Sequence, residues 1–386
     1  MIPYGRQDIN QSDIDAVVEV LQSDYLTQGP QVPLFEKIVT DYCGAQYAVA
    51  VNSATSALHI ACLSLGLTQG DWLWTSPNTF VASANSGLYC GARVDFVDID
   101  PCTYNMCAIA LEQKLIQAKL ENKLPKIVVP VHFAGQSCDM KRINELSKKY
   151  GFFIIEDASH AIGGKYLDQP IGCCVYSDIT IFSFHPVKII TTAEGGLATT
   201  NSFVLAEKMQ LLRSHGITRD PKQMTKESEG GWYYQQIDLG FNYRMTELQA
   251  ALGVSQMQRL DGFVATRHQL QQRYDKLLQS LPIVTPHQFT DSYSALHLYP
   301  IQLQLEKIRK THAEVFNELR ENGIGVNLHY IPVHTHPYYQ NIGFKQGDFP
   351  NAEAYYQRAI SIPLYSGLSF DMQGQVVEVL KKVILA

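Results

Sequence analysis

The sequence predicts an α/β fold with a mainly parallel β-sheet in a large domain, followed by a small C-terminal α+β domain. Short apolar runs alternate with amphipathic helical patterns over the first part of the chain, and most of these runs are too continuously apolar to have one face in water. The length of 386 residues exceeds the ~100–200 residues of one typical domain. After Arg244, a long helical pattern is followed by shorter strands and helices.

The elements of the large domain follow from the pattern in chain order. An early helix is predicted to begin at Ser12, whose hydroxyl can cap it, with Asp15 three residues on as a near capping box. Apolar runs predict strands at residues 47–51, 93–97, 126–131, 152–155 and 179–184. Helices are predicted between them, at the spacing of βαβ crossovers, over residues 54–65, 111–120 and 140–150. Gly195 and Gly196 then lead into a further strand.

We predict a large domain of residues 1–245 and a small domain of residues 246–386. A long helical pattern covers residues 245–281, and a last helix covers residues 377–385. The segment 216–240 is polar, contains glycine and is too long for an ordinary connector. We expect such a loop either to be mobile or to lie across a partner.

Composition excludes several classes of function. Hydrophobic residues make up 46% of the chain, and charged residues only 18%, below the ~25% of an average soluble domain, which suggests that much surface is buried in the core or between subunits. The net charge of −6, without a basic run, argues against nucleic-acid binding. Neither an apolar run of ~18 residues nor a leader-like start is present, so we expect a cytoplasmic protein without a membrane segment. The eight cysteines contain no C-x-x-C pair and are expected to be reduced.

Lys188 is the first candidate for chemistry. It follows a buried strand and lies between Val187 and Ile189, in a segment that re-enters a strand through two glycines. Desolvation by such neighbours lowers the pKa of an amine towards the free base that can form an imine. The alternative is a lysine that extends to water over apolar neighbours.

Asp157 and the hydroxyl residues after residue 51 are the next candidates. Asp157 follows a buried strand, at the carboxyl end where α/β proteins bind ligands, and could hold a pyridine nitrogen protonated or cap a helix. Thr55 and Ser56 stand at a predicted helix N-terminus, which suits a phosphate, although capping is equally compatible. Neither G-x-G-x-x-G after a first strand nor G-x-x-x-x-G-K-[ST] is present, so dinucleotide and P-loop sites lose support.

Together these residues resemble the DegT/DnrJ/EryC1 family of sugar aminotransferases over nearly the whole chain. The matching positions are Thr55 and Ser56, residues 77–80 (Pro-Asn-Thr-Phe), 156–160 (Glu-Asp-Ala-Ser-His), Ser183 with Lys188, and 240–246 (Gly-Phe-Asn-Tyr-Arg-Met-Thr). Residues 26–29, 131–135, 183–188, 213–217 and 326–332 are similar to the branch that serves pseudaminic acid biosynthesis. Ala193 departs from the family pattern, which has glycine there.

The resemblance implies the fold type I of transferases that depend on pyridoxal 5′-phosphate (PLP), as in aspartate aminotransferase. It makes Lys188 the lysine that binds the cofactor and Asp157 the partner of its ring nitrogen; both are the catalytic candidates. The other implied cofactor contacts are Phe80 on the ring face, His160 near the phenolic oxygen, Thr55, Ser56 and Ser183 at the phosphate, and Asn242 at the phosphate of a partner subunit. Implied contacts to a nucleotide sugar are Tyr4, Leu26, Thr27, Gln28, Gly29, Asn327, Leu328, His329 and Tyr330.

The implied reaction transfers the amino group of L-glutamate, through pyridoxamine phosphate, to C4 of a UDP-linked 4-keto-6-deoxy-N-acetylhexosamine. The product would be UDP-4-amino-4,6-dideoxy-N-acetyl-β-L-altrosamine, made by a homodimer with shared active sites. The alternatives are another nucleotide 4-keto sugar, as in perosamine or 4-amino-arabinose pathways, and a non-catalytic cofactor or sugar-nucleotide sensor. A dehydratase of the same fold is disfavoured because Lys188 is kept. No metal is expected, since His329, His334 and His336 have no carboxylate or thiolate nearby in sequence.

Overall fold

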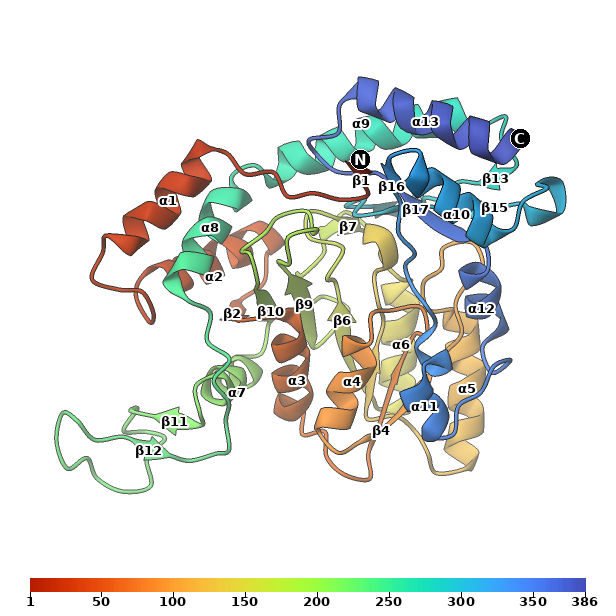
Figure 1. The fold of residues 1–386 in the computed structure, drawn as a ribbon. Helices are drawn as coiled ribbons and strands as arrows, with labels where there is room; N and C mark the ends of the chain where they lie inside the picture. Colours follow the sequence, from red (N-terminus) through yellow and green to blue (C-terminus); the bar gives the residue numbers. More distant parts are fainter.

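The computed structural model describes residues 1–386 and centres on one seven-stranded β-sheet (Figure 1). Along the sheet the strands follow the order β2 (Tyr47–Val51), β10 (Gly196–Thr200), β9 (Ile179–Ser183), β6 (Phe153–Asp157), β5 (Ile127–Val129), β3 (Trp72–Thr75) and β4 (Arg93–Phe96). β10 runs antiparallel to both neighbours, and all other pairs are parallel. The predicted mainly parallel α/β sheet is confirmed.

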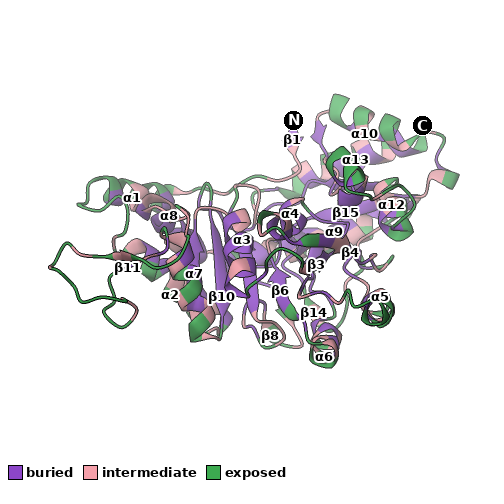
Figure 2. Ribbon diagram, turned by 90° about the horizontal axis from the view of Figure 1, so that it is seen from below, coloured by how far each residue is buried: buried purple, intermediate pink, exposed green.

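Helices cover both faces of this sheet. They are α2 (Gln31–Cys43), α3 (Ala54–Ser64), α4 (Ala82–Tyr89), α5 (Ala108–Leu120), α6 (Met140–Tyr150) and α7 (Phe203–Arg213), whereas α1 (Gln11–Leu21) packs against a helix at Glu247–Met257. Adjacent residues of one strand point to opposite faces: Ile154 packs in the core with α5 and α6, whereas Ile155 packs in the core with α3 and α7. Both faces are therefore dry, which explains the continuously apolar strands; Figure 2 shows the sheet as the buried centre of the molecule.

The C-terminal part is a smaller α+β unit. Its helices are α8 (Glu247–Met257), α9 (Leu260–Leu278), α10 (His312–Glu321), α11 (Pro337–Asn341), α12 (Pro350–Tyr356) and α13 (Phe370–Leu385). Its sheet contains β13 (Ile283–Val284), β15 (Tyr299–Leu303) and β17 (Ala359–Ile362), all antiparallel. Residues of α9, α10, α13 and this sheet share one apolar core. No helix combines the length and apolar character needed to cross a membrane.

Two contacts bear on the predicted division at residue 245, which stays a prediction. α8 packs closely against α1 and α2, on the side of the large sheet, although it follows the predicted boundary. At the other end of the chain, β1 (Ile2–Pro3) pairs in parallel with β16 (Ile324–Gly325), so the N-terminus joins the C-terminal unit. The two parts are tied together at both places.

The prediction that the first helix begins at Ser12 is wrong. α1 begins at Gln11, and Asn10 is its N-cap: the Asn10 side chain accepts a hydrogen bond from the backbone N–H of Asp13, and the Asp13 carboxylate accepts one from the N–H of Asn10. This is a full capping box, shifted two residues towards the N-terminus. Arg259 also binds Asp13 (2.5 Å), a tertiary contact that local sequence cannot reveal.

The long helical pattern predicted over residues 245–281 forms two helices, because the chain breaks at Gln258 and Arg259 between α8 and α9. The Arg259 guanidinium binds the carboxylates of Asp8 and Asp13. A buried carboxylate needs such a partner, and the break brings Arg259 to it. Apolar residues recur at helical spacing both before and after the break, so the sequence pattern looked continuous.

Strand β3 of the large sheet was not predicted, because four residues with two tryptophans form too short a run.

The remaining elements are short. The other strands are β7 (Lys165–Tyr166), β8 (Gln169–Pro170), β11 (Ile217–Thr218), β12 (Gln235–Gln236) and β14 (Ser292–Tyr293). β11 and β12 pair within the segment 216–240, which projects from the body as a long hairpin (Figure 1). Trp232 and Leu239 on this hairpin are exposed by 74% and 76%.

Gly196→Ala is expected to destabilise the protein by at least ~1–3 kcal/mol, the usual cost of overpacking. A Cβ at Gly196 would lie 2.4 Å from the backbone nitrogen of Ala54 and from the carbonyl carbon of Ser53, at the start of α3. Thermal unfolding measures the effect. Gly231→Ala is the matched control, since a Cβ there meets nothing within 4 Å, and an equal loss in both variants would contradict the prediction.

Candidate active site

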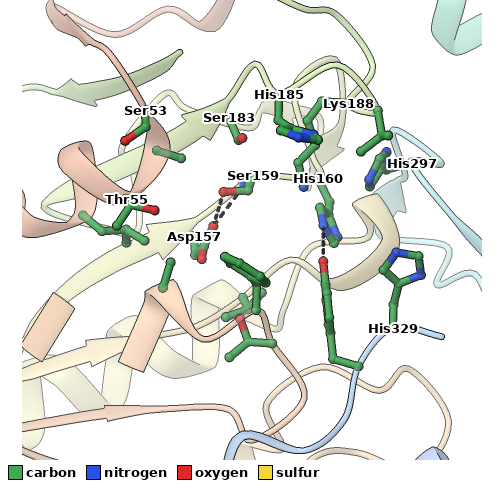
Figure 3. A pocket seen from close by; sticks show the side chains of 18 of the residues that line it. Ser53, Thr55, Asp157, Ser159, His160, Ser183, His185, Lys188, His297 and His329 are labelled. Carbon is green, nitrogen blue, oxygen red and sulfur yellow. Dashed lines mark hydrogen bonds between the residues drawn. The ribbon is translucent and has the colours of Figure 1, made fainter. Parts of the chain in front are cut away.

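A cavity of about 610 Å³ opens at the carboxyl edge of the parallel strands (Figure 3). Asp157 ends β6, Ser183 ends β9 and Ser53 follows β2, and all three line it. The C-terminal unit closes the other side with residues 327–330 and His297. The site therefore lies where α/β folds place ligands, between the two parts of the chain.

The N-terminus of α3 forms one end of the cavity. Ser53 is the N-cap, and its side chain accepts a hydrogen bond from the backbone N–H of Ser56 (3.1 Å). The Ser56 hydroxyl donates to Asn52 (2.7 Å) and does not line the cavity, whereas Thr55 does. Ser53 and Ser56 thus build the helix start, and Ser53, Thr55 and Ser183 face the cavity beside it.

Asp157 is held by hydroxyl groups on both carboxylate oxygens. Ser83 of α4 donates to Oδ2 (2.6 Å), and Ser159 donates to Oδ1 through its hydroxyl (2.6 Å) and its backbone N–H (3.2 Å). No helix begins after Asp157, so the capping alternative does not apply. A buried carboxylate with no arginine or lysine bonded to it is suited to a cationic group of a ligand.

Lys188 extends into the same cavity, between the ring of His160 and the residues after β9 (Figure 3). Burial lowers the pKa of Lys188 to about 8, and the Asp157 carboxylate opposes this shift. The alternative of a solvent-extended lysine is not what the structure shows. Close by, Ala193 has φ of 64°, a left-handed conformation, which explains the glycine expected there.

Modification of Lys188 by trinitrobenzenesulfonate in the cofactor-free protein is expected to accelerate with pH and reach half its maximal rate near pH 8. Only the free amine reacts, and the lowered pKa leaves about one lysine in ten unprotonated at pH 7, against far fewer for an ordinary lysine. Peptide mapping by mass spectrometry gives the rate at each pH. Lys37, exposed on α2, is the internal comparison, and identical pH profiles for the two would contradict the prediction.

Three histidines and a tyrosine form the wall opposite α3. His160 Nε2 and the Tyr330 hydroxyl are 3.0 Å apart, and the rings of His160 and His297 are 4.4 Å apart. Burial, with the positive charge of Lys188, lowers the pKa of His329 to about 3 and that of His160 well below its ordinary value. Burial raises the pKa of Tyr330. Burial also lowers the pKa of His297, so the rings of this wall are neutral near pH 7.

Most predicted site residues meet in this one cavity. Those that line it are Tyr4, Thr55, Phe80, Asp157, His160, Ser183, Lys188, Asn327, Leu328, His329 and Tyr330. Tyr4 reaches it through the β1–β16 pairing and lies 5.3 Å from His329, centroid to centroid. Phe80 is 59% exposed and open to a ligand ring.

Six predicted residues lie outside the cavity of the same chain. Ser56 is used in the helix cap, as described above. Asn242 forms a bridge with Ser214, and its carbonyl accepts a hydrogen bond from Asn52 (3.4 Å). Leu26, Thr27, Gln28 and Gly29 lie between α1 and α2, where the Leu26 carbonyl accepts from the N–H of Glu247.

Other residues of the site were not predicted. Ser159 and His185 stand within motifs already quoted, two residues after Asp157 and Ser183, so position relative to a strand end was a usable signal. Ser83 and His297 come from distant segments and carry no local signal. His334, one of the histidines considered for a metal, pairs with Glu353 (2.9 Å), and no group of three or more His, Cys, Asp or Glu side chains is placed to hold a metal ion.

Comparison with known proteins agrees with this geometry. The family model described as "DegT/DnrJ/EryC1/StrS aminotransferase family" matches residues 7–381. The spore coat polysaccharide biosynthesis protein SpsC of Bacillus subtilis is 40% identical over 99% of this chain and 97% of its own. The UDP-4-amino-4,6-dideoxy-N-acetyl-β-L-altrosamine transaminase of Campylobacter jejuni is 37% identical (96% and 94%), and the GDP-perosamine synthase of Caulobacter vibrioides is 35% identical (96% and 95%).

Solved structures give the same picture. Helicobacter pylori PseC, an aminotransferase of pseudaminic acid biosynthesis, superposes with a TM-score of 0.91 at 31% identity, over 100% of this chain and 99% of the other. The sugar aminotransferase Spr1654 of Streptococcus pneumoniae has TM-scores of 0.89 in its PMP form (30% identity; 100% and 99% covered) and 0.88 in its PLP form (29%; 100% and 98%).

The fold and the site together define an aminotransferase of fold type I that acts on a sugar. A lysine of lowered pKa, a carboxylate at a strand end and an open helix N-terminus are arranged around one cavity of the size of a cofactor and a substrate. The chain belongs to the DegT/DnrJ/EryC1/StrS aminotransferase family. The resemblance predicted from the sequence motifs is confirmed.

Proposed function

We propose that this protein uses PLP to transfer the amino group of L-glutamate to C4 of a UDP-linked 4-keto-6-deoxy-N-acetylhexosamine. The product is UDP-4-amino-4,6-dideoxy-N-acetyl-β-L-altrosamine, a precursor of pseudaminic acid, made in the cytoplasm. The observation that carries the proposal is the single cavity that joins Lys188, Asp157 and the open start of α3 to residues of the C-terminal unit. The likeness to the C. jejuni transaminase and to PseC supports the choice of sugar.

The residues present fit the cofactor. Thr55, Ser183 and the N-terminal end of α3 would hold the phosphate, since a helix N-terminus favours an anion. Asp157 would hold the ring nitrogen in its protonated form, and Phe80 would stack on the ring. The bound pyridine ring supplies an electron sink for the bond that breaks at the amino acid α-carbon. Lys188, with a pKa of about 8, is suited to take up and return the proton of that carbon.

The substrate side of the cavity is built by Tyr4, Asn327, Leu328, His329 and Tyr330. These residues come from the paired β1–β16 region and the segment after it, so they lie on the C-terminal unit. We propose that they contact the nucleotide sugar. His329 is held by Ser361 (2.9 Å) and stays neutral, which suits a hydrogen bond to a sugar hydroxyl or carbonyl.

The functional unit is proposed to be a homodimer. Asn242 and residues 26–29 lie outside the cavity of their own chain, and the hairpin 216–240 projects with exposed Trp232 and Leu239. A second copy that covers these surfaces would bring Asn242 and residues 26–29 to the partner's site. Sedimentation of the purified protein should give twice the monomer mass, and a monomer with full activity would contradict the arrangement.

The test is direct. Purified protein is incubated with PLP, L-glutamate and UDP-linked or GDP-linked 4-keto sugars, and the amino sugars are identified by mass spectrometry and NMR. Amination of the UDP-linked N-acetylhexosulose, at a kcat/KM at least tenfold above the others, is expected. Preference for the GDP-linked sugar would favour the perosamine alternative, which the Caulobacter relative supports. Binding of PLP with no product from any sugar would leave the sensor alternative.

A further inference from the structure

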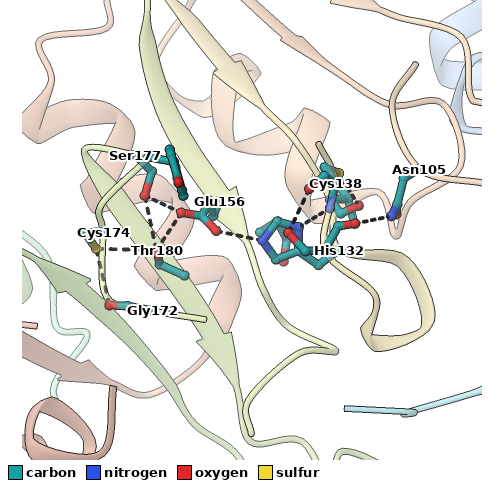
Figure 4. Close-up of polar contacts among 12 residues, drawn as sticks. Asn105, His132, Cys138, Glu156, Gly172, Cys174, Ser177 and Thr180 are labelled. Carbon is teal, nitrogen blue, oxygen red and sulfur yellow. Dashed lines mark hydrogen bonds and ion pairs between the residues drawn. The ribbon is translucent and has the colours of Figure 1, made fainter. Parts of the chain in front are cut away.

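A buried polar cluster lies behind the wall of the cavity and does not line it (Figure 4). Its centre is Glu156, which precedes Asp157 on β6, so the two carboxylates point to opposite faces of the sheet. Glu156 is only 5% exposed. It accepts hydrogen bonds from Ser177 (2.5 Å) and Thr180 (3.3 Å), and its other oxygen lies 2.7 Å from His132 Nε2.

The proton of His132 can be placed from its neighbours. The backbone N–H of Cys138 points at His132 Nδ1 (3.2 Å), and a peptide N–H can only donate. Burial lowers the pKa of His132, whereas the Cys138 side chain and Glu156 raise it. A second proton on Nδ1 would nevertheless face the Cys138 N–H. We therefore assign a neutral ring, in which Nε2–H donates to Glu156 and Nδ1 accepts.

The segment 132–138 is held at several points besides this ring. The N–H of Phe133 donates to Asn105 Oδ1 (2.8 Å), and Asn105 Nδ2 donates to the carbonyls of Gln136 and Ser137 (3.0 Å each). The backbone of His132 also pairs with that of Asp157 (3.0 Å). The segment is a rigid strap between the Glu156 cluster and the cavity.

The strap 132–138 determines which ring nitrogen of His160 carries the proton and donates a hydrogen bond. The N–H of Ala134 points at His160 Nδ1 (3.3 Å), so Nδ1 accepts and the single proton of the neutral ring sits on Nε2. Nε2–H then donates to the Tyr330 oxygen (3.0 Å; dashed in Figure 3). This leaves the Tyr330 hydroxyl proton without an acceptor in the protein, on the side of the cavity. Burial raises the pKa of Tyr330, so the proton stays on it.

We propose that Glu156 and His132 are a positioning pair that fixes the proton of His160 through the strap 132–138 and so makes the Tyr330 hydroxyl a hydrogen-bond donor to the ligand. The acceptor is an oxygen atom, of the bound cofactor or of the keto sugar. The identity of this ligand rests on the proposed function, whereas the direction of the hydrogen bonds does not. Tyr330 contacts the ligand; Glu156 and His132 act only through other residues.

The first test measures which ring nitrogen of His160 carries the proton. In cofactor-free protein labelled with ¹⁵N-histidine, the His160 signals, assigned by their loss in His160→Gln, should show one neutral ring with the proton on Nε2. His132→Gln, which keeps a neutral donor for Glu156, should preserve this form. His132→Phe should give a mixture of both neutral forms. A proton on Nδ1 in the wild type, or an unchanged His160 in a folded His132→Phe, would overturn the proposal.

The second test measures how tightly the ligands bind. Tyr330→Phe and His132→Phe should each weaken either the Kd for PLP or the KM for the keto sugar by roughly threefold to tenfold, the value of one hydrogen bond. The double variant should be no worse than Tyr330→Phe alone, because both remove the same donor. Additive losses, or no loss in either constant, would overturn the proposal. Should His132→Phe not fold, Asn105→Ala releases the strap instead.

The two proposals fail differently. A folded protein that binds no PLP but shows the expected His160 signals overturns the proposed function and leaves the hydrogen-bond direction intact. Normal amino transfer by a protein whose His160 carries its proton on Nδ1 overturns the hydrogen-bond direction and leaves the proposed function intact.

Discussion

Lys188→Ala is expected to abolish amino transfer, with a loss of at least ~10⁴-fold in kcat, the upper range for removing a general acid–base. Lys188 is the only lysine that lines the cavity, and its lowered pKa lets it take up and release a proton near neutral pH. Single-turnover assays with L-glutamate and the PLP-loaded protein measure the loss. The visible absorbance of lysine-bound PLP should disappear in the same variant.

Lys188→Arg is the matched comparison. It keeps a positive charge opposite Asp157 and a long side chain, but a guanidinium stays protonated at all accessible pH values and cannot exchange a proton. We expect it to be as inactive as Lys188→Ala while it keeps more thermal stability. Turnover above about one hundredth of the wild type in either variant would contradict the role of this lysine.

Asp157→Asn should have the second-largest effect, a loss of ~10²-fold or more in kcat/KM together with weaker binding of PLP. The amide keeps an oxygen acceptor for the Ser83 or Ser159 hydroxyl but brings no negative charge to a ring nitrogen. Removing one partner of a buried charge pair costs about 2–5 kcal/mol, and each ~1.4 kcal/mol is tenfold. Equilibrium titration with PLP and steady-state kinetics separate the two effects.

Asp178→Asn is the control for a general loss of stability. Asp178 is a carboxylate at the opposite edge of the sheet, just before β9, where it accepts a hydrogen bond from the N–H of Ile154 (2.7 Å) and lies outside the cavity. We expect Asp178→Asn to lower the unfolding temperature and to leave PLP affinity within twofold. Equal effects of the two variants on PLP affinity would mean that Asp157 acts through the fold alone.

Local pattern was a good guide where a residue's role depends on its position in a strand. Asp157 and Ser183 end buried strands, and all carboxyl ends of a parallel sheet meet at one edge, so their convergence could be predicted. The apolar neighbours of Lys188 made it a candidate but left a solvent-extended lysine as the alternative, and the resemblance to the family singled it out. The helices α3 and α6 were also predicted almost at their observed bounds; α6 buries one apolar face, whereas α3 is buried on nearly every side.

Predictions from the local sequence pattern failed where a contact with a distant residue determines the structure. The long helical pattern is interrupted at Arg259, whose guanidinium binds Asp8 and Asp13 from the other end of the chain. In the same part of the molecule, the N-cap of α1 is Asn10 and not the predicted Ser12. His297 lines the cavity only because its segment packs against the strap, where its N–H donates to the carbonyl of Ala134 (2.9 Å).

By itself, the sequence predicted the sheet from its apolar runs, and it pointed to the lysine and the carboxylate through the family motifs in which they stand. The tertiary structure alone decided which hydroxyl faces the cavity, Thr55 and not Ser56, and which way the hydrogen bonds run from Glu156 to Tyr330. The physical reason is that a hydrogen bond has a direction. The donors and acceptors of this site come from separate segments of the chain, which lie up to 170 residues apart for His160 and Tyr330.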